Sequence, residues 1–98
     1  MVVGIIGGSG LYDLGVPIEE VGISTPFGEP SGKIGRAAIG SNTVLFVPRH
    51  GRGHVIPPSD INYRANIYAL KKLGASLLVS VSAVGSMKKE IAPREFVL

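Results

Sequence analysis

The chain begins with VVGIIGGSG at residues 2–10, a stretch that predicts a buried strand running directly into a tight turn. Residues 2–6 are valine and isoleucine apart from Gly4, and a β-branched run without polar alternation is typical of a strand covered on both faces. The glycines at residues 7 and 8 end the run too soon for it to cross a bilayer. It also lacks the charged start and long apolar core of a signal peptide, so we expect a cytoplasmic protein without membrane contact.

Working outward, four more segments have the composition of strands: residues 18–23, 36–39, 43–47 and 77–81. The second and third flank GSN at residues 40–42 and are expected to form an antiparallel hairpin. Residues 77–81 are another continuous apolar run ended by small residues, so we expect them to lie beside residues 2–6 as a second central strand. Residues 96–98 (FVL) are expected to begin a further strand, which would leave the sheet incomplete within this chain.

Residues 61–73 are expected to form a helix, with Ser59 or Asp60 as its N-cap and Gly74 as its stop. A stripe at helical spacing predicts the face that lies against the sheet, and its members are Tyr63, Asn66, Ile67, Leu70 and Leu73. The fold class is therefore α/β, a mixed twisted sheet with flanking helices, formed by residues 1–98 as a portion of one domain.

Composition narrows the function classes. Hydrophobic residues make up 45% of the chain, which argues against disorder, and the absence of cysteine excludes disulfides, thiolate metal sites and cysteine nucleophiles. The formal charge of +3 comes from basic residues scattered along the chain without interleaved aromatic residues. This distribution favours small anions as ligands and weighs against nucleic acid.

The turn GGSG at residues 7–10 is the first candidate anion site, because glycines let backbone N–H groups converge and the Ser9 hydroxyl adds a donor. Taken alone, the turn is equally consistent with a plain structural turn after a buried strand. A dinucleotide-binding fingerprint fits less well, because its third glycine is missing and no strand ending in an acidic residue follows.

The loop PRHGRGH at residues 48–54 is the second candidate, since it places Arg49 and His50 directly after an apolar strand. A guanidinium offers a planar fork for phosphate oxygens, and the neighbouring imidazole can donate a further hydrogen bond. The alternative is a solvated basic loop. His50 and His54 have the spacing of a helical metal pair, but the glycines and prolines oppose a helix and no carboxylate or cysteine is near in sequence, so no metal is expected.

The third candidate is SAVGS at residues 82–86, where another apolar strand ends and where ligands of open α/β sheets bind. A simple strand-to-helix turn is again the alternative. No serine here lies in a G-x-S-x-G elbow, so a hydrolase nucleophile is not indicated. The three candidates point to the same kind of ligand, an anion.

These motifs, together with TPFG at residues 25–28 and NYRAN at residues 62–66, resemble the nucleoside phosphorylases of the 5'-methylthioadenosine type and their purine nucleoside phosphorylase relatives. The resemblance covers nearly all of the chain and about the first third of a typical family member. It implies phosphorolysis, in which inorganic phosphate attacks the anomeric carbon and the purine leaves. It further implies that phosphate is held by Ser9, Arg49, His50, Ser82 and Ala83.

The resemblance also implies what the chain does not carry. In the family the purine-recognising carboxylates lie C-terminal to the matched part, so no catalytic residue is assigned here and the chain alone is expected to be inactive. It implies a homotrimer or homohexamer, no cofactor beyond phosphate as co-substrate, and a small purine nucleoside as the other substrate. Methylthioinosine, a 6-oxopurine nucleoside, or a non-catalytic role remain alternatives. Where the family shows Pro-Gly-Asp, this chain has Pro93, Arg94 and Glu95, so the family's loop geometry is not carried over there.

Overall fold

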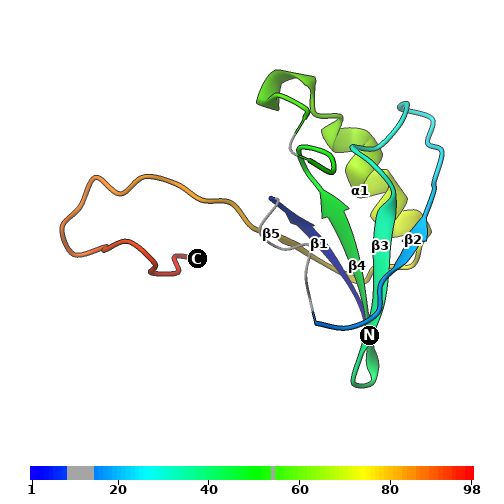
Figure 1. Ribbon diagram of the computed structural model, residues 1–98, viewed down its shortest axis with the longest axis horizontal. Helices are drawn as coiled ribbons and strands as arrows, with labels where there is room; N and C mark the ends of the chain where they lie inside the picture. The colour runs from blue at the N-terminus through cyan, green and yellow to red at the C-terminus, as the bar shows by residue number, and fades with distance from the viewer. Residues whose placement is uncertain (9–14, 54) are drawn as a thin grey trace.

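A computed structural model describes residues 1–8, 15–53 and 55–98 and shows a five-stranded sheet (Figure 1). The strands in chain order are β1 (Val2–Gly7), β2 (Glu19–Val21), β3 (Ile34–Ile39), β4 (Asn42–Pro48) and β5 (Leu77–Ser80). In this part of the chain the helices are a 3₁₀ turn, η2 (Pro58–Asp60), and one α-helix, α1 (Tyr63–Lys72). The strands stand side by side in the order β2-β3-β4-β1-β5.

β1 lies between β4 and β5 and runs parallel to both. The register pairs Gly7 with Pro48 and Ile6 with Ser80, so the three strands end at the same edge of the sheet. The expected neighbourhood of residues 2–6 and 77–81 is therefore confirmed. The expectation that both are central strands is wrong for β5, which is the last strand of the described sheet and is exposed, because an apolar run does not determine the order of strands.

β3 and β4 form the expected antiparallel hairpin, and the short β2 adds to β3 in antiparallel fashion. Residues 18–23 therefore contribute a strand, although only Glu19–Val21 is regular. Parallel pairs on one side of β4 and antiparallel pairs on the other make this the mixed sheet that the sequence predicts. The helix α1 packs against one face of this sheet, as expected of an α/β fold (Figure 1).

The core lies between that face and α1. Its fully buried apolar side chains are those of Ile34, Val47, Ala65 and Ala69, and Leu45 and Leu70 are 1% exposed. Two alanines at helical spacing, Ala65 and Ala69, let the helix lie close to the strands. Close approach also explains Gly4, where an added Cβ would lie 3.1 Å from Cδ1 of Leu70.

Two predictions about the helix need correction. Asn62 is the N-cap, with its side-chain oxygen accepting from the Ala65 N–H at 3.1 Å, whereas Ser59 and Asp60 lie in η2. Tyr63 and Ile67 are 53% and 49% exposed, so the buried face is turned away from part of the predicted stripe. Gly74 follows the helix with φ of 98°, as expected of a stop glycine.

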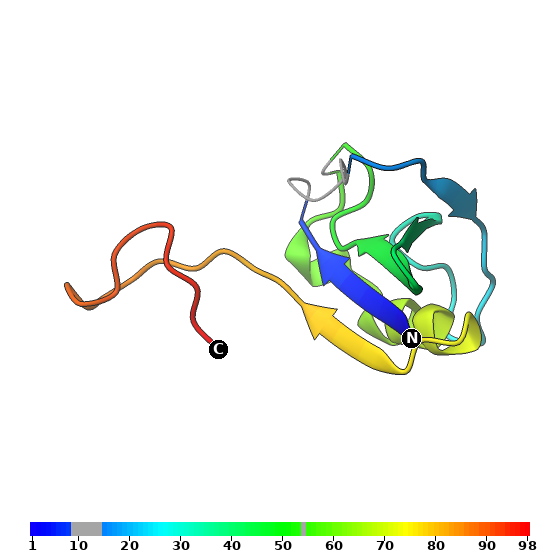
Figure 2. The same ribbon diagram turned by 90° about the horizontal axis from the view of Figure 1, so that it is seen from below.

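After β5 the chain leaves the sheet in extended form, and both views show residues 81–98 running away from it (Figures 1 and 2). The expected strand at residues 96–98 is wrong, because these side chains are exposed and no strand is formed. Arg94 has φ of 74°, within a turn closed by the Glu95 N–H and the Ala92 carbonyl at 3.3 Å. A non-glycine residue in this left-handed conformation costs about 1–2 kcal/mol.

Candidate functional site

The parallel strands bring three separate segments to one edge of the sheet. The residues that follow the strand ends are Gly8 after β1, Arg49 after β4 and Val81 after β5. The register fixes their proximity, because Ile6 pairs with Val47 on one side and with Ser80 on the other. The carboxyl ends of strands in an open α/β sheet are the usual place for a ligand.

Arg49 connects all three strand ends. Its backbone N–H donates to the Gly7 carbonyl at 2.9 Å, which continues the pairing of β4 with β1 by one residue. Its Nη1 donates to the Val81 carbonyl at 2.9 Å, so the side chain crosses the end of β1 to reach β5. A Cβ added to Gly8 would lie 3.9 Å from Nη2, which places the guanidinium beside Gly8.

The His50 ring is hydrogen-bonded to the loop that follows it. Its Nδ1 lies 2.9 Å from the Ile56 carbonyl, and because a carbonyl only accepts, Nδ1 must carry the proton of that bond. In the neutral ring Nε2 is then an acceptor, and it can donate only when the ring is doubly protonated. The loop itself is tight, since a Cβ at Gly51 would meet Ser31 O and Ile56 Cδ1 at 3.2 Å.

Ser82 and Ala83 directly follow Val81 and are exposed in the extended segment beyond β5. The contact with Arg49 is made by their neighbour Val81. Ser82 and Ala83 are near Arg49 only because they follow Val81 in the sequence. Ser9, the remaining predicted phosphate residue, lies outside the described residues.

Sequence reasoning missed two contributors to this region. The Val81 carbonyl has no signal in the sequence, because backbone groups are the same at every residue. Ser31 also lies in no recognisable motif, although its hydroxyl donates to the Arg49 carbonyl at 2.7 Å. The only hint was Asn66, a polar residue in an otherwise apolar helical stripe, which proves to be Ser31's partner at 2.8 Å.

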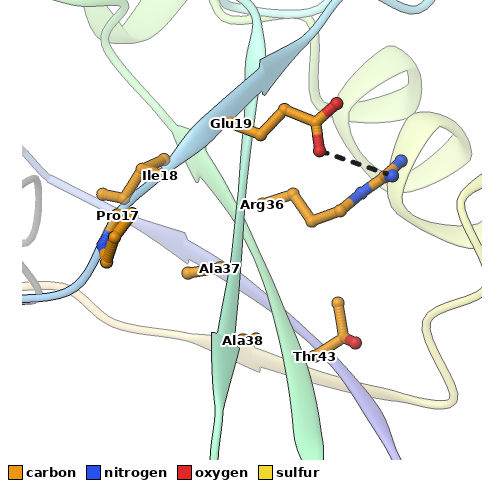
Figure 3. Close-up of a pocket in the computed structure, with 7 residues that line it drawn as sticks. All are labelled: Pro17, Ile18, Glu19, Arg36, Ala37, Ala38 and Thr43. Atoms are coloured by element: carbon orange, nitrogen blue, oxygen red, sulfur yellow. Dashed lines mark ion pairs between the residues drawn. The ribbon is translucent and has the colours of Figure 1, made fainter.

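A separate hollow of about 420 Å³ lies over the other end of the sheet, lined by residues of β2, β3 and β4 and by the segment before β2 (Figure 3). Its guanidinium, that of Arg36, forms an ion pair with Glu19 at 3.8 Å. A carboxylate already opposite the arginine makes this hollow a poor site for an anion. The strand-end site is the better candidate for phosphate.

Residues 1–8, 15–53 and 55–98 contain no group of three or more His, Asp or Glu side chains arranged to hold a metal ion. No helix in the same ranges is long and apolar enough to span a membrane.

Comparison with known proteins gives consistent matches. The sequence profile of the phosphorylase superfamily matches residues 2–98. The S-methyl-5'-thioadenosine phosphorylase of Saccharolobus solfataricus is 55% identical over 98% of this chain and 36% of its own length. The protein of the same name from Geobacter sulfurreducens is 48% identical over 99% of this chain and 35% of its own length.

Solved structures agree with the sequence matches. Methylthioadenosine phosphorylase from Schistosoma mansoni in complex with tubercidin has a TM-score of 0.87 and 44% identity, covering 95% of this chain and 33% of that chain. The complex of the same protein with adenine has a TM-score of 0.85 and 42% identity, covering 95% and 34%. The chain therefore spans about a third of the length of the proteins that it matches.

Proposed function

The chain belongs to the phosphorylase superfamily, and we propose that it supplies the phosphate-binding part of an enzyme that cleaves 5'-methylthioadenosine with inorganic phosphate. The observation that carries the proposal is the position of Arg49, whose guanidinium extends from the end of β4 across β1 to the Val81 carbonyl at the end of β5. A planar cation at the carboxyl edge of a parallel sheet is well placed to bind a tetrahedral anion.

The reaction proposed is displacement at the anomeric carbon. A phosphate oxygen forms the new bond to that carbon, the glycosidic carbon–nitrogen bond breaks, and its electron pair leaves with the adenine, which takes up a proton. The products are adenine and 5-methylthioribose 1-phosphate. Positive charge develops on the ribosyl ring in the transition state, so a phosphate dianion held against the ring stabilises it.

Within this site we assign phosphate contacts to Ser9, Arg49, His50, Ser82 and Ala83. Arg49 provides the charge, His50 and the serine hydroxyls provide hydrogen bonds, and the backbone at Ala83 provides a donor. Phosphate is the co-substrate, and the proposal requires no metal or other cofactor. None of these residues acts on the purine.

The choice of nucleoside follows from the names of the relatives, which are S-methyl-5'-thioadenosine phosphorylases. The chain spans about a third of these relatives, and the resemblance implies that the purine-recognising carboxylates lie C-terminal to the matched part. Methylthioinosine or a 6-oxopurine nucleoside is the alternative substrate. By the same resemblance we propose a cytoplasmic homotrimer or homohexamer for the assembled enzyme.

The test is a titration of the isotope-labelled 98-residue chain with inorganic phosphate, followed by NMR. We expect saturable shifts at the amides of Gly8, Arg49 and Ser82, with no change at Arg36 in the other hollow. Sodium chloride at equal ionic strength is the control for screening. Shifts with NAD and none with phosphate would instead favour a nucleotide-binding module that uses the glycine turn.

A further inference from the structure

Ser31 and Asn66 form a buried polar pair that the proposed chemistry does not use. They lie 35 residues apart in sequence, one in the loop before β3 and the other in α1. Ser31 is 8% exposed and Asn66 is fully buried, and they are the polar residues buried within the described part of the chain. A buried amide and hydroxyl are costly unless every strong hydrogen-bonding group is satisfied.

The hydrogen bonds between them are reciprocal. The Ser31 N–H donates to Oδ1 of Asn66 at 2.8 Å, and Nδ2 of Asn66 donates to Oγ of Ser31 at 3.0 Å. The Ser31 hydroxyl proton is therefore directed elsewhere, and it is donated to the Arg49 carbonyl at 2.7 Å. Asn66 thus fixes the position and the rotation of the hydroxyl that binds Arg49.

The main chain of Arg49 is held from two sides as a result. On one side its N–H donates to the Gly7 carbonyl of β1, and on the other its carbonyl accepts from Ser31. The turn that follows packs against the same serine, because a Cβ at Gly51 would lie 3.2 Å from Ser31 O. The side chain of Arg49 therefore starts from a main chain held on both sides, and its Nη1 donates to the Val81 carbonyl.

We propose that Ser31 and Asn66 are positioning residues that orient Arg49 for phosphate by anchoring its carbonyl to α1. A preorganised guanidinium loses less entropy when it binds an anion than one that must first be ordered. The purpose of the anchor rests on the phosphate-binding role proposed above, whereas the anchoring of the Arg49 main chain is tested without phosphate.

The first measurement is amide hydrogen exchange at Arg49 in phosphate-free buffer. Ser31→Ala removes the hydroxyl, and loss of one neutral hydrogen bond predicts roughly 3- to 10-fold faster exchange at Arg49 than general destabilisation explains. Asn62→Ala is the matched control, because it removes a bond between the same helix and the same loop before β3, that to the Phe27 carbonyl at 2.7 Å, but removes none of the bonds of Ser31 or Arg49. Asn62→Ala should not speed amide exchange at Arg49 beyond what general destabilisation explains.

The second measurement is the phosphate titration of the same variants. Ser31→Ala should raise the phosphate Kd by roughly 3- to 10-fold, whereas Asn62→Ala at similar stability should leave it unchanged. If the alanine variant does not fold, Ser31→Cys keeps the shape and replaces the hydroxyl by a weak donor, with Ser31→Thr as the variant that should restore wild-type behaviour.

Equal effects of the Ser31 and Asn62 variants on Arg49 exchange, or no effect of either, would overturn the anchor. A selective effect on Arg49 exchange in a chain that does not bind phosphate would retain the anchor and reject the proposed function. The two failures are therefore distinguishable.

Discussion

The guanidinium of Arg49 presents five N–H donors in one rigid plane, and one of them is bonded to the Val81 carbonyl. That bond has two effects, since it orients the guanidinium plane and satisfies the carbonyl that follows β5. A lysine has a single charged nitrogen on a flexible stem and cannot both bond Val81 and present a fork to phosphate. The chemistry proposed at this position therefore depends on arginine and not only on positive charge.

We predict that Arg49→Lys weakens phosphate binding by about 1.5–3 kcal/mol, the range for a hydrogen bond to a charged group. The measurement is the phosphate Kd by NMR titration or calorimetry. Arg36→Lys is the control, because Arg36 faces Glu19 in the other hollow and should leave the affinity unchanged. An unchanged affinity in Arg49→Lys would remove Arg49 from the phosphate site.

Among the elements, the start of α1 shows how a single side chain joins a helix to a loop. The Asn62 side-chain oxygen accepts from the Ala65 N–H, and its Nδ2 donates to the Phe27 carbonyl at 2.7 Å. Phe27 in turn lies edge-on to Tyr68, with ring centroids 5.9 Å apart, and under the guanidinium of Arg64. Asn62 therefore closes the helix and holds the loop before β3 at the same time.

We predict that Asn62→Ala lowers the free energy of unfolding by about 1–2 kcal/mol, since loss of an N-cap alone costs about 1 kcal/mol. Urea denaturation gives the measurement. Ser59→Ala and Asp60→Ala are the controls, because both residues lie in η2 and are exposed, and each should change stability by less than about 0.5 kcal/mol. A larger loss in either control than in Asn62→Ala would restore the cap expected from the sequence.

The elements also show what the sequence could and could not predict. Continuous apolar runs identified β1, β4 and β5, and the turn residues between β3 and β4 identified the hairpin, because both signals are local. The buried face of α1 was harder, since large side chains were expected inward, whereas Ala65 and Ala69 are buried and Tyr63 is exposed. Close helix–sheet contact favours small residues, and that distance is set by tertiary packing.

The same distinction between local sequence signals and tertiary contacts applies to the candidate site. The place of Arg49 at a strand end was predictable, because the residue directly follows an apolar run, whereas the parallel pairing of that strand with β1 was not. Neither was the direction of the His50 ring, since it depends on the Ile56 carbonyl brought near by the loop. Ser31 was not predictable either, because its role exists only through Asn66 and Arg49, which are distant from it in sequence.

At the scale of the whole molecule, the described sheet has an unpaired edge along β5. β5 is its last strand, and the side chains of Leu77, Leu78 and Val79 are 40–50% exposed. Parallel sheets are normally covered on both faces, and an open apolar edge is a template for another chain. The matched structures are about three times as long as this chain, so more polypeptide is present in them than the described sheet contains.

We predict that the 98-residue chain self-associates through this edge and that Val79→Lys reduces the association, because an edge lysine opposes strand pairing. Sedimentation velocity over a range of concentrations provides the measurement. Val55→Lys is the matched control, since Val55 is 73% exposed but lies in a loop. Association that persists in Val79→Lys and is lost in Val55→Lys would place the contact elsewhere.

The last prediction is that the 98-residue chain does not release adenine from methylthioadenosine, even where it binds phosphate. Cleavage needs both a held phosphate and help for the leaving purine, and general acid catalysis of that kind contributes about 100- to 10,000-fold. Among the described carboxylates, Glu19 pairs with Arg36 and Glu20 with Arg52, away from the end of β5. The remaining ones lie in a loop, in η2 or in the segment beyond β5: Glu29, Asp60, Glu90 and Glu95. The assay uses purified chain, phosphate and methylthioadenosine, with the Saccharolobus solfataricus relative as the positive control. Adenine release by the chain above a no-enzyme blank would contradict the prediction and show that these 98 residues suffice for the whole reaction.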